Sequence, residues 1–441
     1  MSKLTVILPS LNVVKYIRQC LTSVINQSYK QLDIICVDAG SDDGTLDIIE
    51  EFAKIDDRIR VVNCIEKSYG KQVNIALDIA LGDYVAIVDT DDFIALDMYE
   101  KLMYLVEKNS LDFVKCNYWE HYEFEDHKFY NHKKTIISIN ELYNCVIDPK
   151  EYPQLHCQDG YLWSGIYNLE FLKRKNIRFN TTVGAAFQDV GFFHQVTYYA
   201  DRIMFIDNYG YYYRIGREGN SISNPNGLRY MLQEYKYLIN NEMIPLVNLL
   251  QWKYIYKKMI FSYIAECDKK IVYSQINSQL VKPYLQEATN MILECIEKKY
   301  ISKNDFDDVY WNKLISFLRD INKYIQERKI YDEYKEKLIK CCEKQNLRKN
   351  CAIVIFGAGI RGKHLIDLLL CYGINIDAII DNNSKKYGDK INNIEIVSLN
   401  DIIKTGKNVL FIIAMKNNIE DVYKQLIDKN IEKNMIYISK I

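Results

Sequence analysis

Residues 84–93 read YVAIVDTDDF, an apolar run that ends in three carboxylates. The run predicts a buried strand, and a buried carboxylate without partners costs several kcal/mol. At a strand end the acids can instead project into a cleft and share a divalent cation such as Mn²⁺ or Mg²⁺, which also binds diphosphate oxygens. Asp89 and Asp91 point to the same side if the strand geometry continues past Thr90. The stretch therefore predicts a metal site, with a solvated acidic turn as the alternative.

The residues before this stretch alternate between strands and helices. Largely apolar strands with helices between them imply a parallel sheet covered on both faces. Such sheets bind ligands beyond the carboxyl ends of their strands, and the polar clusters of this sequence fall at those ends. The predicted strands are Leu4–Leu8, Leu32–Val37, Ile59–Val62 and Tyr84–Val88; the predicted helices are Tyr16–Asn26, Thr45–Phe52 and Val73–Ala80.

The order and spacing of the motifs resemble a family 2 glycosyltransferase with the GT-A fold. The resemblance covers roughly residues 1–225. It implies inverting, metal-dependent transfer of a sugar, of the hexosyl type, from a nucleotide diphosphate donor to an acceptor hydroxyl. The matching stretches are LTVILPSLN from residue 4, GDYVAIVDTDDF to residue 93, LWSGIYNLEFLKRKNIRF at 162–179, FQDVGFF at 187–193 and YYYRIGREGNSIS at 211–223.

The resemblance also implies which residues hold the donor. Uridine diphosphate is the favoured carrier by this resemblance only, and Ala39 stands where the family often has a second acid, which leaves the base less specified. Asp38 has an alternative role as a turn cap. The donor residues implied are Pro9, Leu11, Asn12, Asp38, Lys71, Asp89, Thr90 and Asp91.

The acceptor hydroxyl must lose a proton, so a positioned carboxylate is needed as general base. The family places this base in an acidic pair, which here corresponds to Gln188 and Asp189. We assign the base to Asp189, and a helix N-cap is the alternative role. Loss of the neighbouring acid at Gln188 is expected to lower the pKa of the base.

Two further segments supply candidates for the donor and the acceptor. Arg214 and Arg217 lie in an aromatic, Gly-containing stretch that could close over the diphosphate, because guanidinium groups pair well with its oxygens. A solvated basic turn is the alternative. Trp163 and Asp159 are candidates for the acceptor site, and a core position is the alternative for Trp163.

The rest of the chain reads as two further parts. We expect a GT-A domain over 1–230, a helical segment over 231–349 and a small Rossmann-like α/β domain over 350–441. In the last part Gly357, Gly359 and Gly362 follow a strand and open a helix, and Asp381 ends the next strand, which is the context of a dinucleotide fingerprint. A module for docking or assembly is the alternative to dinucleotide binding.

Composition narrows the class of protein. The 441 residues carry a formal net charge of −1, which gives no support to nucleic-acid binding. Twelve cysteines without CxxC spacing, no secretory signal and no apolar run long enough for a membrane span fit a cytoplasmic enzyme. Contact with the inner face of the cell membrane and a homo-oligomer stay open. The expected acceptor is a surface polysaccharide or lipid-linked glycan; the rivals are an NAD-dependent oxidoreductase and a non-catalytic scaffold.

Overall fold

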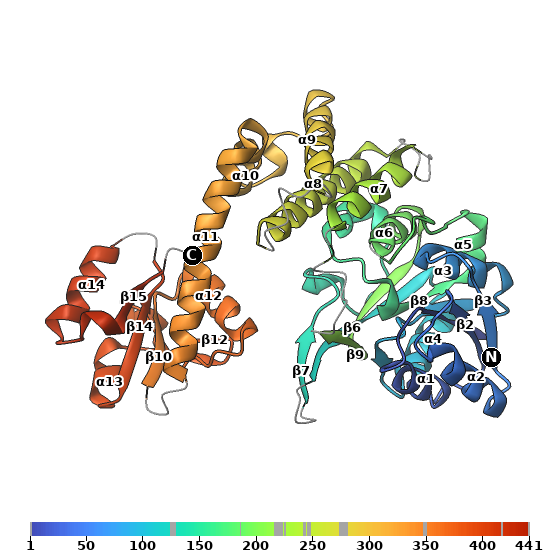
Figure 1. Ribbon diagram of the computed structural model, residues 1–441, viewed down its shortest axis with the longest axis horizontal. Helices are drawn as coiled ribbons and strands as arrows, with labels where there is room; N and C mark the ends of the chain where they lie inside the picture. The colour runs from blue at the N-terminus through green and yellow to red at the C-terminus, as the bar shows by residue number, and fades with distance from the viewer. Residues whose placement is uncertain are drawn as a thin grey trace. The chain divides into compact units, whose positions relative to one another are not determined.

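The computed structural model describes residues 2–123, 129–185, 187–215, 224, 226–240, 244, 248–272, 281–346, 351–415 and 418–439. Contacts divide the chain into two compact units, Met1–Leu318 and Arg319–Ile441. Each unit is described by itself, and Figure 1 labels the elements of both. Within the described ranges, every helix is too short or too polar to cross a membrane.

The first unit begins with a parallel sheet in the order β3-β2-β1-β4. The predicted strands and helices are confirmed, with ends that differ by a few residues. Pro9 does not end its strand, because β1 continues to Ser10 and pairs with β2 as far as Asp38. The elements are β1 (Leu4–Ser10), α1 (Ile17–Ile25), β2 (Leu32–Asp38), α2 (Thr45–Ile55), β3 (Ile59–Asn63), α3 (Tyr69–Ile79) and β4 (Tyr84–Ile87).

This sheet extends through antiparallel and parallel neighbours. β4 pairs antiparallel with β8, β8 antiparallel with β6, and β6 parallel with β9, so the sheet is mixed beyond its first four strands. Its order continues β4-β8-β6-β9-β5, with β7 paired to β6. The added elements are β5 (Phe93–Ile94), α4 (Met98–Asn109), β6 (Phe113–Glu123), β7 (Phe129–Lys134), β8 (Gly165–Asn168), α5 (Leu169–Arg174), α6 (Gln188–Tyr199) and β9 (Ile203–Ile215), with short 3₁₀ turns η1 (Asn140–Leu142), η2 (Pro149–Glu151), η3 (Pro153–Cys157) and η4 (Leu162–Ser164).

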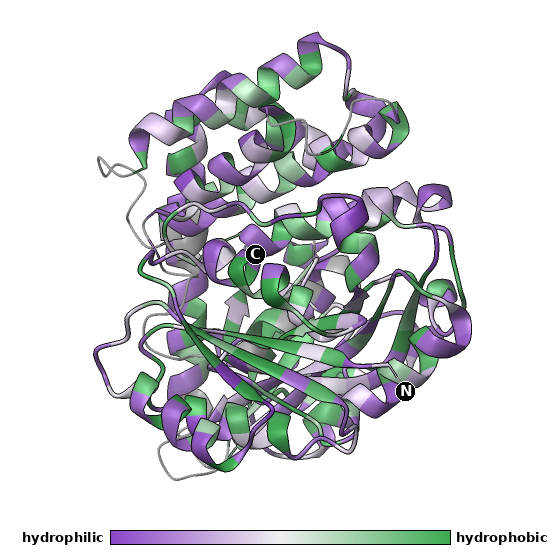
Figure 2. Ribbon diagram, turned by 90° about the vertical axis from the view of Figure 1, so that its right-hand side faces the viewer, coloured by the Kyte–Doolittle hydropathy of each residue, from purple (hydrophilic) through white to green (hydrophobic). Residues whose placement is uncertain are grey.

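Burial of both sheet faces accounts for the composition of the strands. Every residue of β1 and β2 is buried, whereas the helices bury one side only; α1, for example, buries Ile17, Leu21 and Val24. Figure 1 shows α1, α2 and α4 on one side of the sheet and α3, α5 and α6 on the other. Figure 2 shows the strands as mostly hydrophobic and the helices as mixed. Because β1 is parallel to β2 and to β4, the carboxyl ends of these strands lie at one edge of the sheet.

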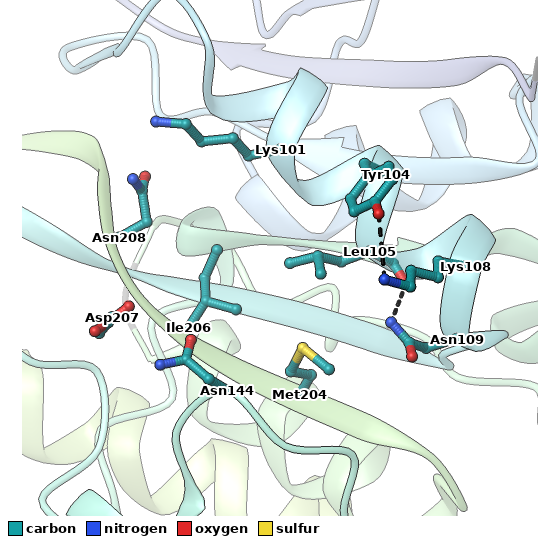
Figure 3. A pocket seen from close by; sticks show the side chains of 10 residues that line it. All are labelled: Lys101, Tyr104, Leu105, Lys108, Asn109, Asn144, Met204, Ile206, Asp207 and Asn208. Carbon is teal, nitrogen blue, oxygen red and sulfur yellow. Dashed lines mark hydrogen bonds between the residues drawn. The ribbon is translucent and has the colours of Figure 1, made fainter.

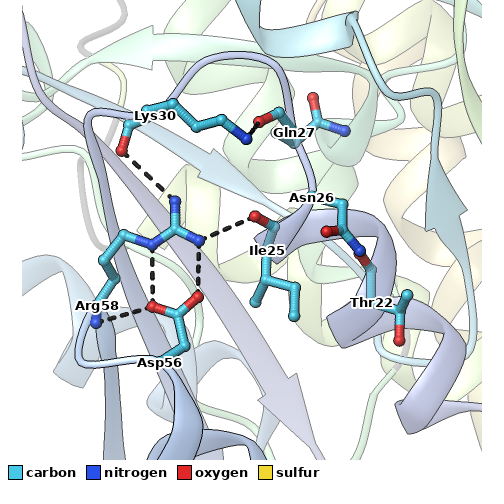
Figure 4. Close-up of polar contacts among 7 residues, drawn as sticks. All are labelled: Thr22, Ile25, Asn26, Gln27, Lys30, Asp56 and Arg58. Carbon is cyan, nitrogen blue, oxygen red and sulfur yellow. Dashed lines mark hydrogen bonds and ion pairs between the residues drawn. The ribbon is translucent and has the colours of Figure 1, made fainter.

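A guanidinium group joins the end of α1 to the loop before β3 (Figure 4). Arg58 donates through Nε and Nη2 to both carboxylate oxygens of Asp56, at 2.9 and 2.6 Å, and through Nη2 to the carbonyl of Ile25 at 2.9 Å. The carbonyl is one that the helix end leaves without an intrahelical partner. The contact is structural and fixes the spacing of α1 and β3.

Helices follow the sheet within the first unit. The helical segment begins at Gly227, four residues before the expected start at 231, and its first two helices pack against α6 and η3. Asn180 donates to Glu234 of α7 at 3.0 Å, and a buried Glu266–Lys270 pair of α8 joins the helices to Asn224. The elements are α7 (Gly227–Asn240), α8 (Leu249–Val272), α9 (Lys282–Glu297), η6 (Lys303–Asp305) and α10 (Asp308–Arg319).

The second unit holds a second sheet, as expected. Its order is β12-β13-β11-β10-β14-β15, and all of its pairs are parallel except β12 with β13. The long helix α11 belongs to this unit, because Leu338, Ile339 and Cys342 lie in the core beneath β10. The elements are α11 (Ile321–Asn346), β10 (Cys351–Phe356), α12 (Ile360–Cys371), β11 (Ala378–Ile380), η7 (Ser384–Lys386), β12 (Lys390–Ile391), β13 (Ile394–Val397), α13 (Leu399–Lys404), β14 (Asn408–Ile413), α14 (Ile419–Asp428), η8 (Lys433–Met435) and β15 (Ile436–Ile438).

The division at Leu318 leads to a prediction about truncated chains. A chain ending at Leu318 should fold, because it keeps the contacts of the first unit. A chain ending at residue 345 should fold too, but α11 should lose protection from hydrogen exchange, since an isolated helix is marginal in water. Hydrogen exchange with mass spectrometry, with the full chain as control, measures this. Equal protection of 321–345 in the truncated and the full chain would contradict the division.

Candidate active site

The carboxyl ends of β1, β2 and β4 are held together by side chains. Gln72 is buried in α3 and donates through Nε2 to the carbonyls of Ser10 and Val37, at 2.9 and 2.7 Å. The Thr90 hydroxyl donates to the carbonyl of Pro9 at 2.9 Å. These bonds satisfy backbone groups where the strand ladder stops. They give Pro9 and Thr90 a structural role at the edge where the donor is expected.

The turn after β2 is organised by Asp38. Its Oδ2 accepts from the backbone N–H groups of Gly40 and Ser41, both at 2.9 Å, and its Oδ1 accepts from the Ser41 hydroxyl at 2.5 Å. Asp38 therefore caps its own turn. The left-handed Asn12 faces this turn and accepts from the N–H of Asp42 at 3.0 Å. Leu11 is half-buried and Asn12 is exposed beside it; the nucleotide contacts of all three stay a prediction.

The acids after β4 have different surroundings. Asp92 is buried and accepts from the Tyr211 hydroxyl at 2.9 Å and from the N–H of Arg214 at 2.7 Å. Burial, together with the charges of Asp91 and Asp89, holds the pKa of Asp92 well above its ordinary value. The third acid of the turn therefore fixes β9 against the end of β4.

Arg214 reinforces the same junction. Its Nε donates to the carbonyl of Asp91 at 2.9 Å, its Nη2 donates to Gln19 at 2.7 Å, and the guanidinium forms an ion pair with Glu123. The guanidinium also lies over the Tyr16 ring, 4.8 Å from its centroid. The side chain is buried, so these protein groups occupy it, and its predicted contact with a diphosphate stays a prediction. Arg217 lies outside the described residues.

Tyr69 connects the acids of β4 with the second half of the site. Its hydroxyl donates to Asp89 Oδ1 at 2.8 Å. Burial and the charges of Asp89, Asp189 and Asp91 raise its pKa, so one phenol lies within electrostatic range of all three carboxylates. The backbone around it is clipped to the segment before α6, because Tyr69 N–H donates to the carbonyl of Gly184 at 3.1 Å. Lys71 is half-buried in the same helix turn, which Ser68 caps.

Asp189 lies in the first turn of α6, but it is not the N-cap. Phe187 occupies that position with φ 67°, and Asp189 Oδ1 accepts from the N–H of Val190 at 3.0 Å. Burial raises the pKa of Asp189, whereas Val190 and Lys115 lower it. The pKa is therefore raised although Gln188 replaces the neighbouring acid. Gln188 instead donates to Thr182 and to the carbonyl of Gly184, both at 3.3 Å.

The candidates for the acceptor site differ in exposure. Trp163 is 4% exposed, and its ring stacks on those of Tyr211 and Tyr213, at 4.2 and 5.3 Å between centroids. It is a core ring that also stacks on Tyr161, and Tyr161 and Tyr213 are half-buried. The Asp159 carboxylate is two-thirds exposed and forms an ion pair with Lys258 of α8 at 2.9 Å. An acceptor contact by either residue stays a prediction.

Sequence reasoning missed the roles of Tyr69, Gln72, Lys115, Asp92 and Tyr211. Their signals were weak, because each acts through a contact with residues far away in the sequence. In the described chain we find no group of three or more His, Cys, Asp or Glu side chains arranged to hold a metal ion. The assignment of Asp89 and Asp91 as metal ligands stays a prediction.

Comparison with known proteins identifies the family. The profile described as Glycosyl transferase family 2 matches residues 5–170. Glycosyltransferase GlyG of Streptococcus pneumoniae is 30% identical over 216 residues, which are 48% of this chain and 70% of GlyG. The chain belongs to glycosyl transferase family 2.

Other known proteins are similar to parts of this chain. TuaG of Bacillus subtilis, whose name refers to teichuronic acid biosynthesis, is 40% identical over 116 residues, 26% of this chain and 46% of TuaG. The chain spans 62% and 31% of the lengths of two other curated relatives. The crystal structure of S. aureus TarS 1–349 in complex with UDP-GlcNAc aligns with TM-score 0.53 and 19% identity over 75% of this chain and 89% of that one. This likeness confirms the GT-A fold.

The glycine-rich loop of the second unit lies outside the family 2 match. Gly357 has φ 122°, and a Cβ on Gly362 would lie 1.7 Å from the carbonyl oxygen of Gly357, so both positions require glycine. Asp381 accepts from the N–H of Ala358 at 3.0 Å and from Lys386 Nζ at 2.8 Å. The acid expected at a ribose therefore holds the loop itself. Gly359 has open space around it, and a bound dinucleotide stays a prediction.

A surface hollow of about 500 Å³ lies away from the acids, between α4 and β9 (Figure 3). Lys108 Nζ donates to the Tyr104 hydroxyl at 3.2 Å along its rim, and Asn109 donates to the carbonyl of Leu105 at 2.9 Å. These contacts are between neighbouring turns of one helix. None of the residues that line the hollow is one of the predicted donor or acceptor residues.

Glu234 provides a test of the packing behind Asp189. Burial raises the pKa of Glu234 to about 8, so the folded chain keeps a proton that the unfolded chain releases above pH ~4.5. The free energy of unfolding should therefore fall between about pH 5 and 8, by on the order of a few kcal/mol, and level off above that. Glu234→Gln should remove this slope in urea denaturation of the full chain. Exposed Glu50→Gln should keep it, and an unchanged slope in Glu234→Gln would refute the assignment.

Proposed function

We propose that this family 2 protein is an inverting glycosyltransferase that moves a sugar from a UDP-sugar to a hydroxyl of a glycan or lipid-linked glycan. The observation that carries the proposal is that Tyr69 joins the two halves of the site. Its hydroxyl donates to Asp89 and its backbone N–H binds Gly184, in the segment that leads to Asp189. A donor-binding pair of acids and a base on the opposite side of the reacting carbon are what an in-line displacement requires.

Each side chain then has a role in one step. Asp89 and Asp91 would hold Mn²⁺ or Mg²⁺, which supplies charge neutralisation to the leaving diphosphate when bound. The Asp189 carboxylate accepts the proton of the acceptor hydroxyl. At the same time the hydroxyl oxygen bonds to the anomeric carbon, and the bond from that carbon to the diphosphate oxygen breaks. One displacement inverts the configuration at that carbon. Tyr69 orients Asp89 through its hydrogen bond at 2.8 Å.

The donor and the pathway rest on the similarities. TarS, which shares the fold, is seen with UDP-GlcNAc, so a uridine donor is the first one to test. The name of TuaG supports an acceptor in surface polysaccharide synthesis. All cysteines whose side chains are described are free thiols, which supports a reducing, cytoplasmic location.

Substitution of Asp91 tests the metal assignment. Asp91→Asn keeps the size of the side chain but weakens it as a ligand of a hard cation. The affinity for UDP in the presence of Mn²⁺ should fall roughly tenfold or more, a loss of about 1.4 kcal/mol. Isothermal calorimetry with and without Mn²⁺ measures this, with the exposed Asp57→Asn as the matched control. An affinity equal to that of the unmodified chain would refute the assignment of Asp91 as a metal ligand.

Substitution of Asp189 tests the base. Asp189→Asn cannot accept a proton, and it leaves the helix start intact because Phe187 is the N-cap. Turnover should fall by roughly 10²–10⁴-fold, while UDP binding stays unchanged and the chain stays folded. The assay is metal-dependent hydrolysis of the best donor in a nucleotide-sugar screen that begins with UDP-GlcNAc. Exposed Asp57→Asn serves as control, and full turnover in Asp189→Asn would exclude Asp189 as the base.

A further inference from the structure

A lysine without a hydrogen-bonding partner lies inside the first unit. The Lys115 side chain on β6 has no exposed surface, and its Nζ has no hydrogen-bond partner among the described residues. The nearest described ring is that of Phe193, whose centroid is 4.9 Å from Nζ. Burial of an ammonium group is costly unless an opposite charge compensates it. The position therefore calls for an anion nearby.

Two glycines make room for this arrangement. A Cβ on Gly165 would lie 2.9 Å from Lys115 Cγ, and a Cβ on Gly160 would lie 2.4 Å from the Phe193 ring. Phe193 follows Asp189 by four residues in α6, so both side chains lie on the same face of the helix. Lys115 therefore lies against the face of α6 that carries Asp189, and the two charges act on each other.

The other titratable groups around Asp189 come from several elements. Two of them are the acids Asp159 and Glu234. Glu234 keeps its proton up to about pH 8, because burial raises its pKa. His156 of η3 and His194 of α6 are neutral, because burial lowers their pKa values, and Lys150 of η2 pairs with Asp201. The remaining groups are phenols, Tyr69, Tyr161, Tyr167 and Tyr235. Lys115 is thus the cation that faces Asp189 in this set.

We propose that Lys115 is a positioning residue whose ammonium keeps the Asp189 carboxylate ionised and ready to accept a proton. The inference rests on the proposed role of Asp189 as base. Burial opposes ionisation of Asp189, and a protonated carboxyl cannot take the proton of an acceptor. Burial lowers the pKa of Lys115 to about 7, so Lys115 carries its charge below that pH.

The direct test is the titration of Asp189 in the full chain. With ¹³C-labelled aspartate, the carboxyl signal of Asp189 is the one lost in Asp189→Asn. In Lys115→Met, which removes the charge but keeps the length, its midpoint should rise by about one pH unit or more. Lys115→Arg keeps the charge and should keep the midpoint. An unchanged midpoint in a folded Lys115→Met chain, checked by its melting temperature, would overturn the proposal.

The activity test separates this inference from the proposed function. The acidic limb of the pH profile of UDP-GlcNAc hydrolysis with Mn²⁺ should move upward in Lys115→Met by the same amount and stay in place in Lys115→Arg. A merely structural role would lower turnover equally at every pH. Full hydrolysis by Asp189→Asn would refute the base itself, whereas an inactive Asp189→Asn with an unmoved limb in Lys115→Met would refute the positioning role alone.

Discussion

Burial of the Asp92 carboxyl at the end of β4 is the constraint on which the site depends. Two donors from β9 meet it, the Tyr211 hydroxyl and the N–H of Arg214, at 2.9 and 2.7 Å. A buried carboxyl that lost these donors would be strongly destabilising. β9 must therefore lie against the Asp-rich turn, and with β9 come Tyr213 and the ring stack around Trp163. The sheet edge that carries Asp89 and Asp91 is rigid for this reason.

A second junction brings Asp189, the base that we propose, to that edge. The backbone of Tyr69 binds Gly184, and Gln188 binds the same residue from the start of α6. Gly191 of α6 lies against Glu234 of α7, where a Cβ would lie 1.7 Å from its Oε1. The helical segment thus supports the helix that carries Asp189. Its packing is part of the first unit, which is why the contacts divide the chain after Leu318 and not near residue 230.

The sequence predicted the four parallel strands of the first sheet, because they are largely apolar and polar turns follow them. The candidate acids were also visible, since each follows a strand or opens a helix. The partners were not visible: Lys115 looks like an ordinary charged residue of an exposed strand until β8 and α6 cover it. The role of Arg214 could not be predicted either, because its partners Gln19 and Glu123 lie far away in the sequence. Tertiary contacts, rather than local patterns, assign these side chains.

Acids that look alike in sequence are separated by the donors that meet them. Asp38 ends a parallel strand, and Asp381 directly follows one. Asp38 accepts two backbone N–H groups of the turn after it, whereas Asp381 accepts one from the turn after it and one from Ala358 in the glycine-rich loop. Such bonds stabilise a carboxylate and hold a loop, but they use the oxygens that a ligand would need. Asp189 differs, because the N–H that its Oδ1 accepts belongs to its own neighbour Val190, and the bond holds no separate loop. In our proposal the charge of Lys115 favours the ionised form of Asp189 without a hydrogen bond, so Oδ2 can accept a proton. Support by a charge without a hydrogen bond is what would distinguish a base from a turn cap.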